Sequence, residues 1–224
     1  MSGGEDDDAA GGYASPPCFL HEVDPVYAGL DPRERADVMR WRKAERERLI
    51  RERLAIPVDR RRTLSEAVAT NLEAAIGPLA GLTISAYWPF RGEPDLRAFL
   101  AWAAAQGATT ALPVVAAKGQ PMIFRAWKKG EPLEPGVWNI PIPKAEAAVV
   151  VPDVLIAPVV GFDSGCYRLG YGGGFFDRTL AAMTTRRRVF GVGFRQQVIA
   201  TIYPQWHDVP LDAIVLEDGV IQRG

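Results

Sequence analysis

Short apolar runs alternate with segments of helical periodicity over residues 82–216. The apolar runs are Leu82–Pro89, Thr109–Val115, Pro121–Trp127, Asp153–Val160, Arg188–Phe194 and Ala213–Leu216. Helices are expected at Asp95–Gln106, with Gly107 just past its end, and from about Gly174 to Met183. Strands that alternate with helices in this way are typical of a mainly parallel sheet. The sequence therefore predicts a three-layer α/β fold with helices on both faces of the sheet.

Two further helices are expected before this region. The segment Pro32–Ile56 is dense in Arg and Glu, carries apolar residues at intervals, and stops before Pro57. A second helix should extend from about Leu64 to Ile76, where Gly77 and Pro78 follow. We therefore predict one α/β domain over residues 32–224, preceded by an irregular N-terminal arm.

The arm, residues 1–31, is rich in Gly, Asp, Pro and Ala and shows little periodicity. Within it Cys18, His21 and Glu22 are residue types that bind metals. Because no second ligand group lies nearby, we favour an arm that packs on the body or on a second subunit. The sequence leaves monomer and homodimer open.

Composition excludes several classes of protein. Lys plus Arg number 26 and Asp plus Glu number 27, so overall charge gives no reason to expect nucleic-acid or membrane binding. Two cysteines cannot build a disulfide framework, and the acidic, Gly-rich N-terminus is unlike a signal peptide. The uncharged run Ala98–Ala117 is interrupted by Gly107 and Pro113, which favours a helix, a turn and a strand over a membrane span. We expect a cytoplasmic protein.

A glycine-rich loop follows the apolar run Asp153–Val160. Five residues between Gly165 and Gly174 are glycine, and a helix is expected directly afterwards. A loop between a strand end and a helix N-terminus is where open α/β sheets bind ligands, and glycines let backbone N–H groups surround phosphate oxygens. A loop that needs glycine only to turn would look similar.

Charged residues beside the glycines favour a nucleotide. Arg168 precedes them, and Asp177 and Arg178 follow in the first helical turn. Arginine suits phosphate oxygens, and aspartate suits a magnesium ion that carries them. The loop lacks the Lys of a Walker A motif, and Phe175 stands where GxGxxG needs its third glycine. With two histidines in the chain and no GxSxG around Ser164, a hydrolase triad is poorly supported.

The segment RLGYGGGFFDR resembles the signature of the 5-formyltetrahydrofolate cyclo-ligase family, also called methenyltetrahydrofolate synthetase. Three further blocks agree in order and spacing: RWRKAER (Arg40–Arg46), AYWPFRGEPD (Ala86–Asp95) and PQWHDVPLD (Pro204–Asp212). The resemblance implies that ATP phosphorylates the formyl oxygen of 5-formyltetrahydrofolate, after which N10 attacks the activated carbon and phosphate leaves. The expected cofactor is Mg²⁺, with ATP and 5-formyltetrahydrofolate as partners.

The resemblance also implies roles for individual residues. ATP contacts are expected from Arg42, Lys43, Arg46, Arg168, Leu169, Gly170, Tyr171, Gly172, Gly173, Gly174, Phe175 and Phe176. Arg168 and Tyr171 are the expected catalytic residues, and Asp177 and Asp208 the expected magnesium ligands. Substrate contacts are expected from Glu93, Trp138 and Tyr171. Judged without the resemblance, Glu93 would be an exposed turn residue and Trp138 a core residue.

This chain departs from some members of that family at the glycine loop. Those members carry Lys at the position of Gly173 and Tyr at those of Phe175 and Phe176. Any role of the missing hydroxyls is absent here or passes to Tyr171 or Tyr167. The alternative is a relative of the same fold that binds a nucleotide or sugar phosphate without this reaction, and the joint presence of Glu93, Asp177 and Asp208 argues against it. A nucleic-acid protein using the Arg-rich helix is a third interpretation, which the interleaved acidic residues weaken.

Overall fold

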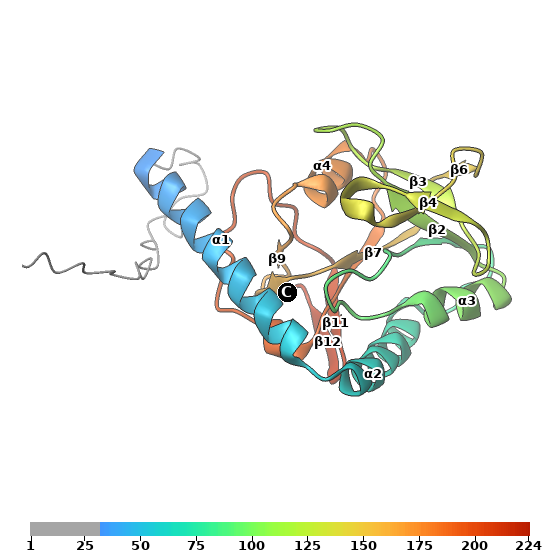
Figure 1. Ribbon diagram of the computed structural model, residues 1–224, viewed down its shortest axis with the longest axis horizontal. Coiled ribbons are helices and arrows are strands. Elements are labelled where there is room, and N and C mark those ends of the chain that lie inside the picture. The colour runs from blue at the N-terminus through green and yellow to red at the C-terminus, as the bar shows by residue number, and fades with distance from the viewer. Residues whose placement is uncertain (1–31) are drawn as a thin grey trace, which may run out of the picture. The chain divides into compact units, whose positions relative to one another are not determined.

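The computed structural model describes residues 32–224 (Figure 1). The chain divides into two compact units, residues 1–45 and 46–224, and helix α1 (Pro32–Ala55) crosses the division. The predicted arm, with Cys18, His21 and Glu22, lies outside the described residues. Its structure and its boundary with the domain remain predictions.

The second unit is built on an eight-stranded sheet. In spatial order its strands are β12 (Gly219–Gln222), β11 (Ala213–Leu216), β10 (Arg188–Val192), β7 (Val154–Pro158), β1 (Thr83–Ser85), β2 (Thr109–Val114), β3 (Ile123–Ala126) and β6 (Val149–Val150). The central strands, from β11 to β2, are all parallel to their neighbours. β12, β3 and β6 add antiparallel edges, and β2 and β3 form a hairpin. The predicted mainly parallel sheet is confirmed.

Helices cover both faces of this sheet. Leu72 of α2 (Val58–Ile76) and Leu100 of α3 (Arg97–Ala105) share one buried cluster with Ile156 of β7. The preceding residue of β7, Leu155, points to the opposite face and shares a cluster with Leu180 of α4 (Phe175–Ala182). In Figure 1, α2 and α3 accordingly lie on one side of the sheet and α4 on the other. This alternation along β7 gives the three layers that the sequence predicts.

The expected start of the second helix was wrong. α2 begins at Val58 rather than near Leu64. Pro57 ends α1 and fixes the turn, and Arg61 donates from Nη1 to the carbonyls of Leu54 and Ile56. These bonds satisfy oxygens that the end of α1 leaves open, so the Arg-rich stretch after Pro57 is helical.

Several short elements escaped sequence prediction because they are too brief to show periodicity. They are the hairpins β4 (Leu133–Pro135) with β5 (Pro141–Pro143) and β8 (Gly161–Phe162) with β9 (Arg168–Leu169), the 3₁₀ turns η2 (Val137–Asn139) and η3 (Arg195–Gln197), and the strands β6 and β12. The Ala98–Ala117 run is α3, a turn at Gly107 and β2, as expected. Over residues 32–224, no helix combines the length and apolar character needed to cross a membrane.

Candidate active site

The candidate site lies beyond the carboxyl ends of two parallel strands. β7 leads through the β8–β9 hairpin to the glycine loop Gly170–Gly174, and β1 leads into the segment Ala86–Glu93. Because β1 and β7 pair in parallel, both connections leave the same edge of the sheet. This is the edge at which open α/β sheets hold their ligands.

The glycine loop adopts backbone angles that favour glycine. Gly172 and Gly174 have φ of 91° and 62°, in the left-handed region that favours glycine, and Gly174 directly precedes α4. Arg46 donates from Nε to the Gly170 carbonyl at 2.6 Å. The structure thus brings Arg46 to the loop. Arg42 and Lys43 lie in the first unit, so their contacts with ATP remain predictions.

Arg168 and Asp177 form a buried ion pair beside this loop. Arg168 Nη2 lies 3.0 Å from Asp177 Oδ1. That oxygen also accepts the Val209 N–H, and Arg168 Nη1 donates to the Val209 carbonyl. Burial lowers the pKa of Arg168, and the nearby Asp177 and Asp208 carboxylates act in the opposite direction. Arg168 therefore ties the start of α4 to the loop that holds Asp208.

The two predicted magnesium ligands are neighbours. Asp177 accepts a hydrogen bond from the residue after Asp208, and Asp208 Oδ2 accepts the Gln205 N–H at 2.6 Å. Within the described residues, no hydrogen bond engages Asp177 Oδ2, and no group of three or more His, Cys, Asp or Glu side chains forms a metal cluster. Two carboxylates suit Mg²⁺, which keeps several waters and takes phosphate oxygens as its remaining ligands.

The two phenylalanines that replace Tyr in some relatives pack against arginines. The Arg178 guanidinium lies over the Phe175 ring and donates to the Gly173 carbonyl, while Arg168 lies over the Phe176 ring. These rings therefore support the cations around the loop. Arg178 follows the glycines in the sequence, and its guanidinium also contacts them in the structure.

Glu93 is buried rather than exposed, with 5 % of its surface accessible. Its Oε2 accepts the Phe90 N–H at 2.8 Å, and its Oε1 accepts the Tyr171 hydroxyl at 2.9 Å. Burial raises the pKa of Glu93 to about 7, although Arg53, Phe90 and Tyr171 all act to lower it. Burial and Glu93 likewise raise the pKa of Tyr171. The expectation of an exposed turn residue, drawn without the resemblance, was wrong.

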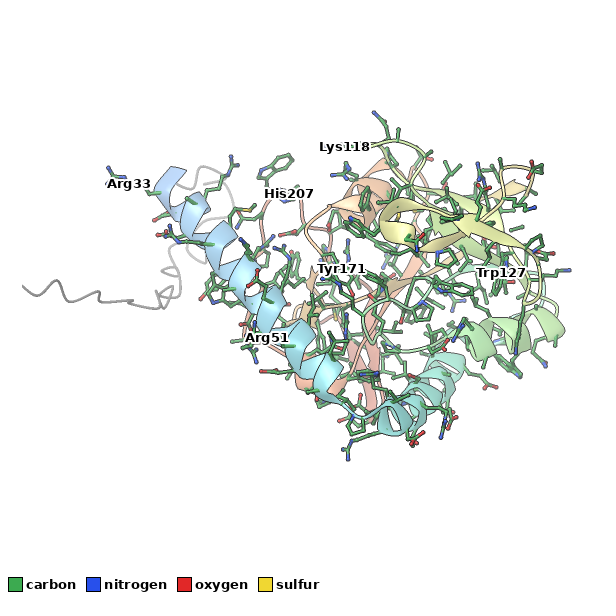
Figure 2. All side chains as sticks on the ribbon, viewed as in Figure 1. Arg33, Arg51, Lys118, Trp127, Tyr171 and His207 are labelled. Atoms are coloured by element: carbon green, nitrogen blue, oxygen red, sulfur yellow. The ribbon has the colours of Figure 1, made fainter. Side chains whose placement is uncertain are left out.

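Aromatic rings surround this carboxylate. Trp138, 52 % exposed, stacks on Phe90 at 6.5 Å between centroids and meets Tyr171 and Phe175 edge-on at 6.2 and 6.0 Å. Trp138 has φ of 57°, in the left-handed region, which is costly for a tryptophan. The structure thus brings Trp138, Tyr171 and Glu93 together, as the substrate assignment requires. Figure 2 shows Tyr171 among side chains from several segments of the second unit.

Sequence reasoning missed Arg53 and Phe90. Arg53 belongs to a helix dense in Arg and Glu, where most charged side chains are expected to face solvent, yet it is fully buried. A signal was present, because Arg53 follows the buried Leu49 by four residues and so shares its helix face. Phe90 could not be identified from the sequence, because a single aromatic residue in a loop forms no periodic pattern that indicates a role.

Tyr171 belongs to both halves of the site. It is part of the glycine loop, and its hydroxyl reaches the carboxylate beside the aromatic rings. A phosphate donor at the loop and a flat, hydrogen-bonding acceptor at the rings would thereby meet. The fold and site are those expected of an α/β enzyme that binds a nucleotide at its glycine loop.

Comparison with known proteins identifies the family. The sequence profile of the 5-formyltetrahydrofolate cyclo-ligase family matches residues 38–217, so the chain belongs to that family. The 5-formyltetrahydrofolate cyclo-ligase of Mycolicibacterium smegmatis is 33 % identical over 169 residues, covering 69 % of this chain and 87 % of the relative. That of Escherichia coli K12 is 28 % identical over 174 residues, covering 75 % and 96 %.

Solved structures agree with this assignment. The 5,10-methenyltetrahydrofolate synthetase of Aquifex aeolicus superimposes with a TM-score of 0.71 at 27 % identity, covering 81 % of this chain and 92 % of that one. A synthetase from Mycoplasma pneumoniae gives a TM-score of 0.64 at 22 % identity, covering 79 % and 98 %, and supports the fold alone.

Proposed function

We propose that this chain uses ATP to convert 5-formyltetrahydrofolate to 5,10-methenyltetrahydrofolate at the site formed by Ala86–Glu93, Trp138 and the glycine loop. The family supplies the reaction. The observation that carries the location is the bond from Tyr171, inside the loop, to the buried Glu93 carboxylate. It joins a phosphate site and a site for a flat polar ring.

The chemistry explains why ATP is needed. A formyl amide is a poor electrophile, and its oxygen is a poor leaving group. Transfer of the γ-phosphoryl group to the formyl oxygen releases ADP and leaves a carbon bearing phosphate. N10 then attacks that carbon, the C–O bond breaks, and phosphate departs with the N10 proton. Such transfers are catalysed mainly by positioning and by positive charge around the phosphoryl group.

We assign the nucleotide side to the loop. Backbone N–H groups of Gly170–Gly174 and the N-terminus of α4 would bind phosphate oxygens, supported by Arg46. Leu169, Phe175 and Phe176 flank this cradle. Arg168 holds Asp177 in place, and its predicted contact with phosphate remains a proposal. The contacts of Arg42 and Lys43 with ATP are likewise part of the proposal.

Asp177 and Asp208 are the residues that we propose to hold Mg²⁺. Asp177 Oδ2 is available, and Asp208 lies beside the Val209 N–H that bonds to Asp177. A bound magnesium ion would neutralise charge on the ATP phosphates. In its absence Arg168 partly balances the two carboxylates.

The substrate side would recognise the pterin. A carboxylate can accept two hydrogen bonds from neighbouring N–H groups of such a ring, and we assign this role to Glu93. Trp138 and Phe90 offer apolar faces for its planar system. Tyr171 would orient the reacting group through its hydroxyl. Monomer and homodimer both remain compatible with this proposal.

The direct test mixes the purified protein with Mg²⁺, ATP and 5-formyltetrahydrofolate. We expect the methenyl chromophore to appear in step with ADP, with no effect of added NAD(P)H. Omission of ATP or chelation of Mg²⁺ should stop it. ATP binding without product would favour a nucleotide-binding relative of the same fold, and conversion without ATP would exclude this reaction.

A further inference from the structure

A fully buried arginine lies behind the candidate site, outside the family's signature blocks. Arg53 is 0 % exposed although it comes from the charge-rich α1. Its guanidinium donates from Nε to the Arg91 carbonyl at 3.0 Å, from Nη1 to the Val159 carbonyl at 3.1 Å, and from Nη2 to the Tyr171 hydroxyl at 2.6 Å. It thus touches the substrate segment, the end of β7 and the glycine loop together.

The direction of these hydrogen bonds fixes the chemistry of Glu93. A guanidinium only donates, so the Tyr171 oxygen accepts from Arg53. The Tyr171 hydroxyl has two acceptors within reach, Glu93 Oε1 at 2.9 Å and the Phe90 carbonyl at 3.4 Å. The shorter contact assigns its single proton to Glu93 Oε1, and Glu93 Oε2 accepts the Phe90 N–H. Both oxygens of Glu93 act as acceptors, which is the pattern of a carboxylate. That is also the form that would accept hydrogen bonds from a pterin.

Few other charged or titratable groups of the described residues lie near enough to Glu93 to stabilise its carboxylate. Tyr87, which follows β1, and Tyr171 lie close enough to Glu93 for their ionisation to be coupled to it. Asp95, two residues after Glu93, acts to raise the pKa of Tyr87. Arg61 of α2 packs near Gly92, but its guanidinium bonds to the carbonyls at the end of α1. Among these groups, Arg53 is the cation that offsets the burial of Glu93.

We propose that Arg53 is a positioning residue that, through the Tyr171 hydroxyl, keeps the Glu93 carboxylate charged and aimed at the substrate. The inference rests on the proposed function and adds a residue to it. Arg53 touches no substrate itself. A buried charge is retained where it organises other groups, and removing one partner of such a network leaves the rest uncompensated.

Arg53→Met should change substrate recognition in a pH-dependent way. An opposite charge at this range lowers a carboxyl pKa by about one unit or more, so its loss should raise that of Glu93. For a one-unit rise, the ionised fraction at pH 7 falls from about a half to about a tenth, and KM for 5-formyltetrahydrofolate rises about fivefold. Near pH 9 the two enzymes should converge. Arg53→Lys should restore part of the wild-type profile.

Matched variants distinguish an effect of Arg53 on Glu93 from a purely structural contribution of Arg53. Arg51→Met removes an equal charge from an exposed side chain two residues away (Figure 2), and it should leave the profile unchanged. In a Glu93→Gln background, Arg53→Met should change KM less than about twofold. An equal loss at every pH, or the same loss with and without Glu93, would overturn the inference.

A readout without catalysis keeps the test independent of the reaction. The melting difference between an enzyme and its Glu93→Gln form, followed from pH 5 to 9, reports where Glu93 ionises. Arg53→Met should move that transition to higher pH, and an unmoved transition counts against the inference. If Arg53→Met does not fold, Tyr171→Phe interrupts the same relay, and an unchanged transition there is equally decisive. A wild type that makes no methenyl product would instead refute the proposed function.

Discussion

The glycine loop and the segment Ala86–Glu93 both continue strands of one sheet, but they are held in different ways. The loop has backbone angles that only glycine adopts easily. Two arginines donate hydrogen bonds to its carbonyls, Arg46 to that of Gly170 and Arg178 to that of Gly173. The substrate segment is fixed by buried side chains. Tyr87 donates to the Pro94 carbonyl, and Glu93 bonds back to the Phe90 N–H.

The difference follows from what each half must bind. A phosphate is met by backbone N–H groups and positive charge, so side chains there would only be in the way. A heterocycle needs acceptors and apolar faces at fixed positions, which side chains provide. Substitutions in the loop region should therefore act on turnover, whereas those in the substrate segment should act on affinity.

The largest effect is expected for Asp177→Asn. If this carboxylate holds Mg²⁺, the amide cannot replace its charge, and kcat should fall about a hundredfold or more, about 2.7 kcal/mol. As a first-turn residue only, Asp177 would contribute about 0.3 to 1 kcal/mol to stability and nothing to turnover. The measurement is kcat across a magnesium titration, with thermal melting recorded alongside.

Asp212→Asn is a matched control for that variant. Asp212 also accepts a backbone N–H, that of Val189, and also pairs with an arginine, Arg186, but it precedes β11 at the opposite edge of the sheet. We expect it to lower the melting temperature without changing the magnesium requirement. If Asp177→Asn behaves in the same way, the assignment of Asp177 to the metal is wrong.

Glu93→Gln should affect folate with little effect on ATP. Loss of the carboxylate leaves N–H groups of the substrate without an ionised acceptor, which costs about 1.5 to 3 kcal/mol, so KM for 5-formyltetrahydrofolate should rise roughly 10- to 150-fold. The KM for ATP should change little, because Tyr171 can still bond to the amide. Steady-state kinetics with each substrate varied in turn gives both values.

Glu131→Gln is the control for that substitution. Glu131 accepts the N–H of Lys128 three residues earlier, as Glu93 does with Phe90, but it is exposed. Its substitution should leave both KM values unchanged. Equal losses of ATP and folate affinity in Glu93→Gln would instead make Glu93 part of the nucleotide site.

Features that depend on local sequence patterns could be predicted, whereas contacts between distant segments could not. The βαβ order, the glycine loop and the block AYWPFRGEPD are local patterns, so the sheet and the resemblance were predictable from the sequence. The bond between Tyr171 and Glu93 joins residues 78 positions apart, and no local pattern encodes it. Burial of Arg53 was hidden for a related reason, since its partners Arg91, Val159 and Tyr171 come from three other segments.

The same Glu93→Gln variant should gain stability in alkaline solution. The folded pKa of about 7 lies above the ordinary 4.5, so the contribution of Glu93 is fully present below about pH 4.5 and is lost as pH rises through 7. The shift corresponds to at most about 3 kcal/mol, and weaker hydrogen bonds of the amide should leave a gain of about 1 to 2 kcal/mol.

Thermal melting of the two proteins from pH 5 to 9 tests this expectation. The variant should match wild type near pH 5 and melt a few degrees higher at pH 8. A higher melting temperature together with poorer folate use would show that the buried carboxylate is kept for recognition rather than for stability. A variant that is less stable at pH 8 would contradict the assigned cost of burying this charge.

The smallest effect is expected for Trp138→Ala, which tests whether the exposed ring of the substrate half acts on affinity alone. About half of the Trp138 surface is accessible, so its removal gives up little buried area and should cost less than about 1 kcal/mol of stability. A ring that stacks on a pterin is worth about 0.5 to 1.5 kcal/mol, so KM for 5-formyltetrahydrofolate should rise about 2- to 12-fold at constant kcat. Trp138→Phe keeps an aromatic face and should retain most of the affinity. If both variants lose kcat instead, the ring positions Tyr171 and Phe175, which it meets edge-on, and its role belongs to the phosphate loop.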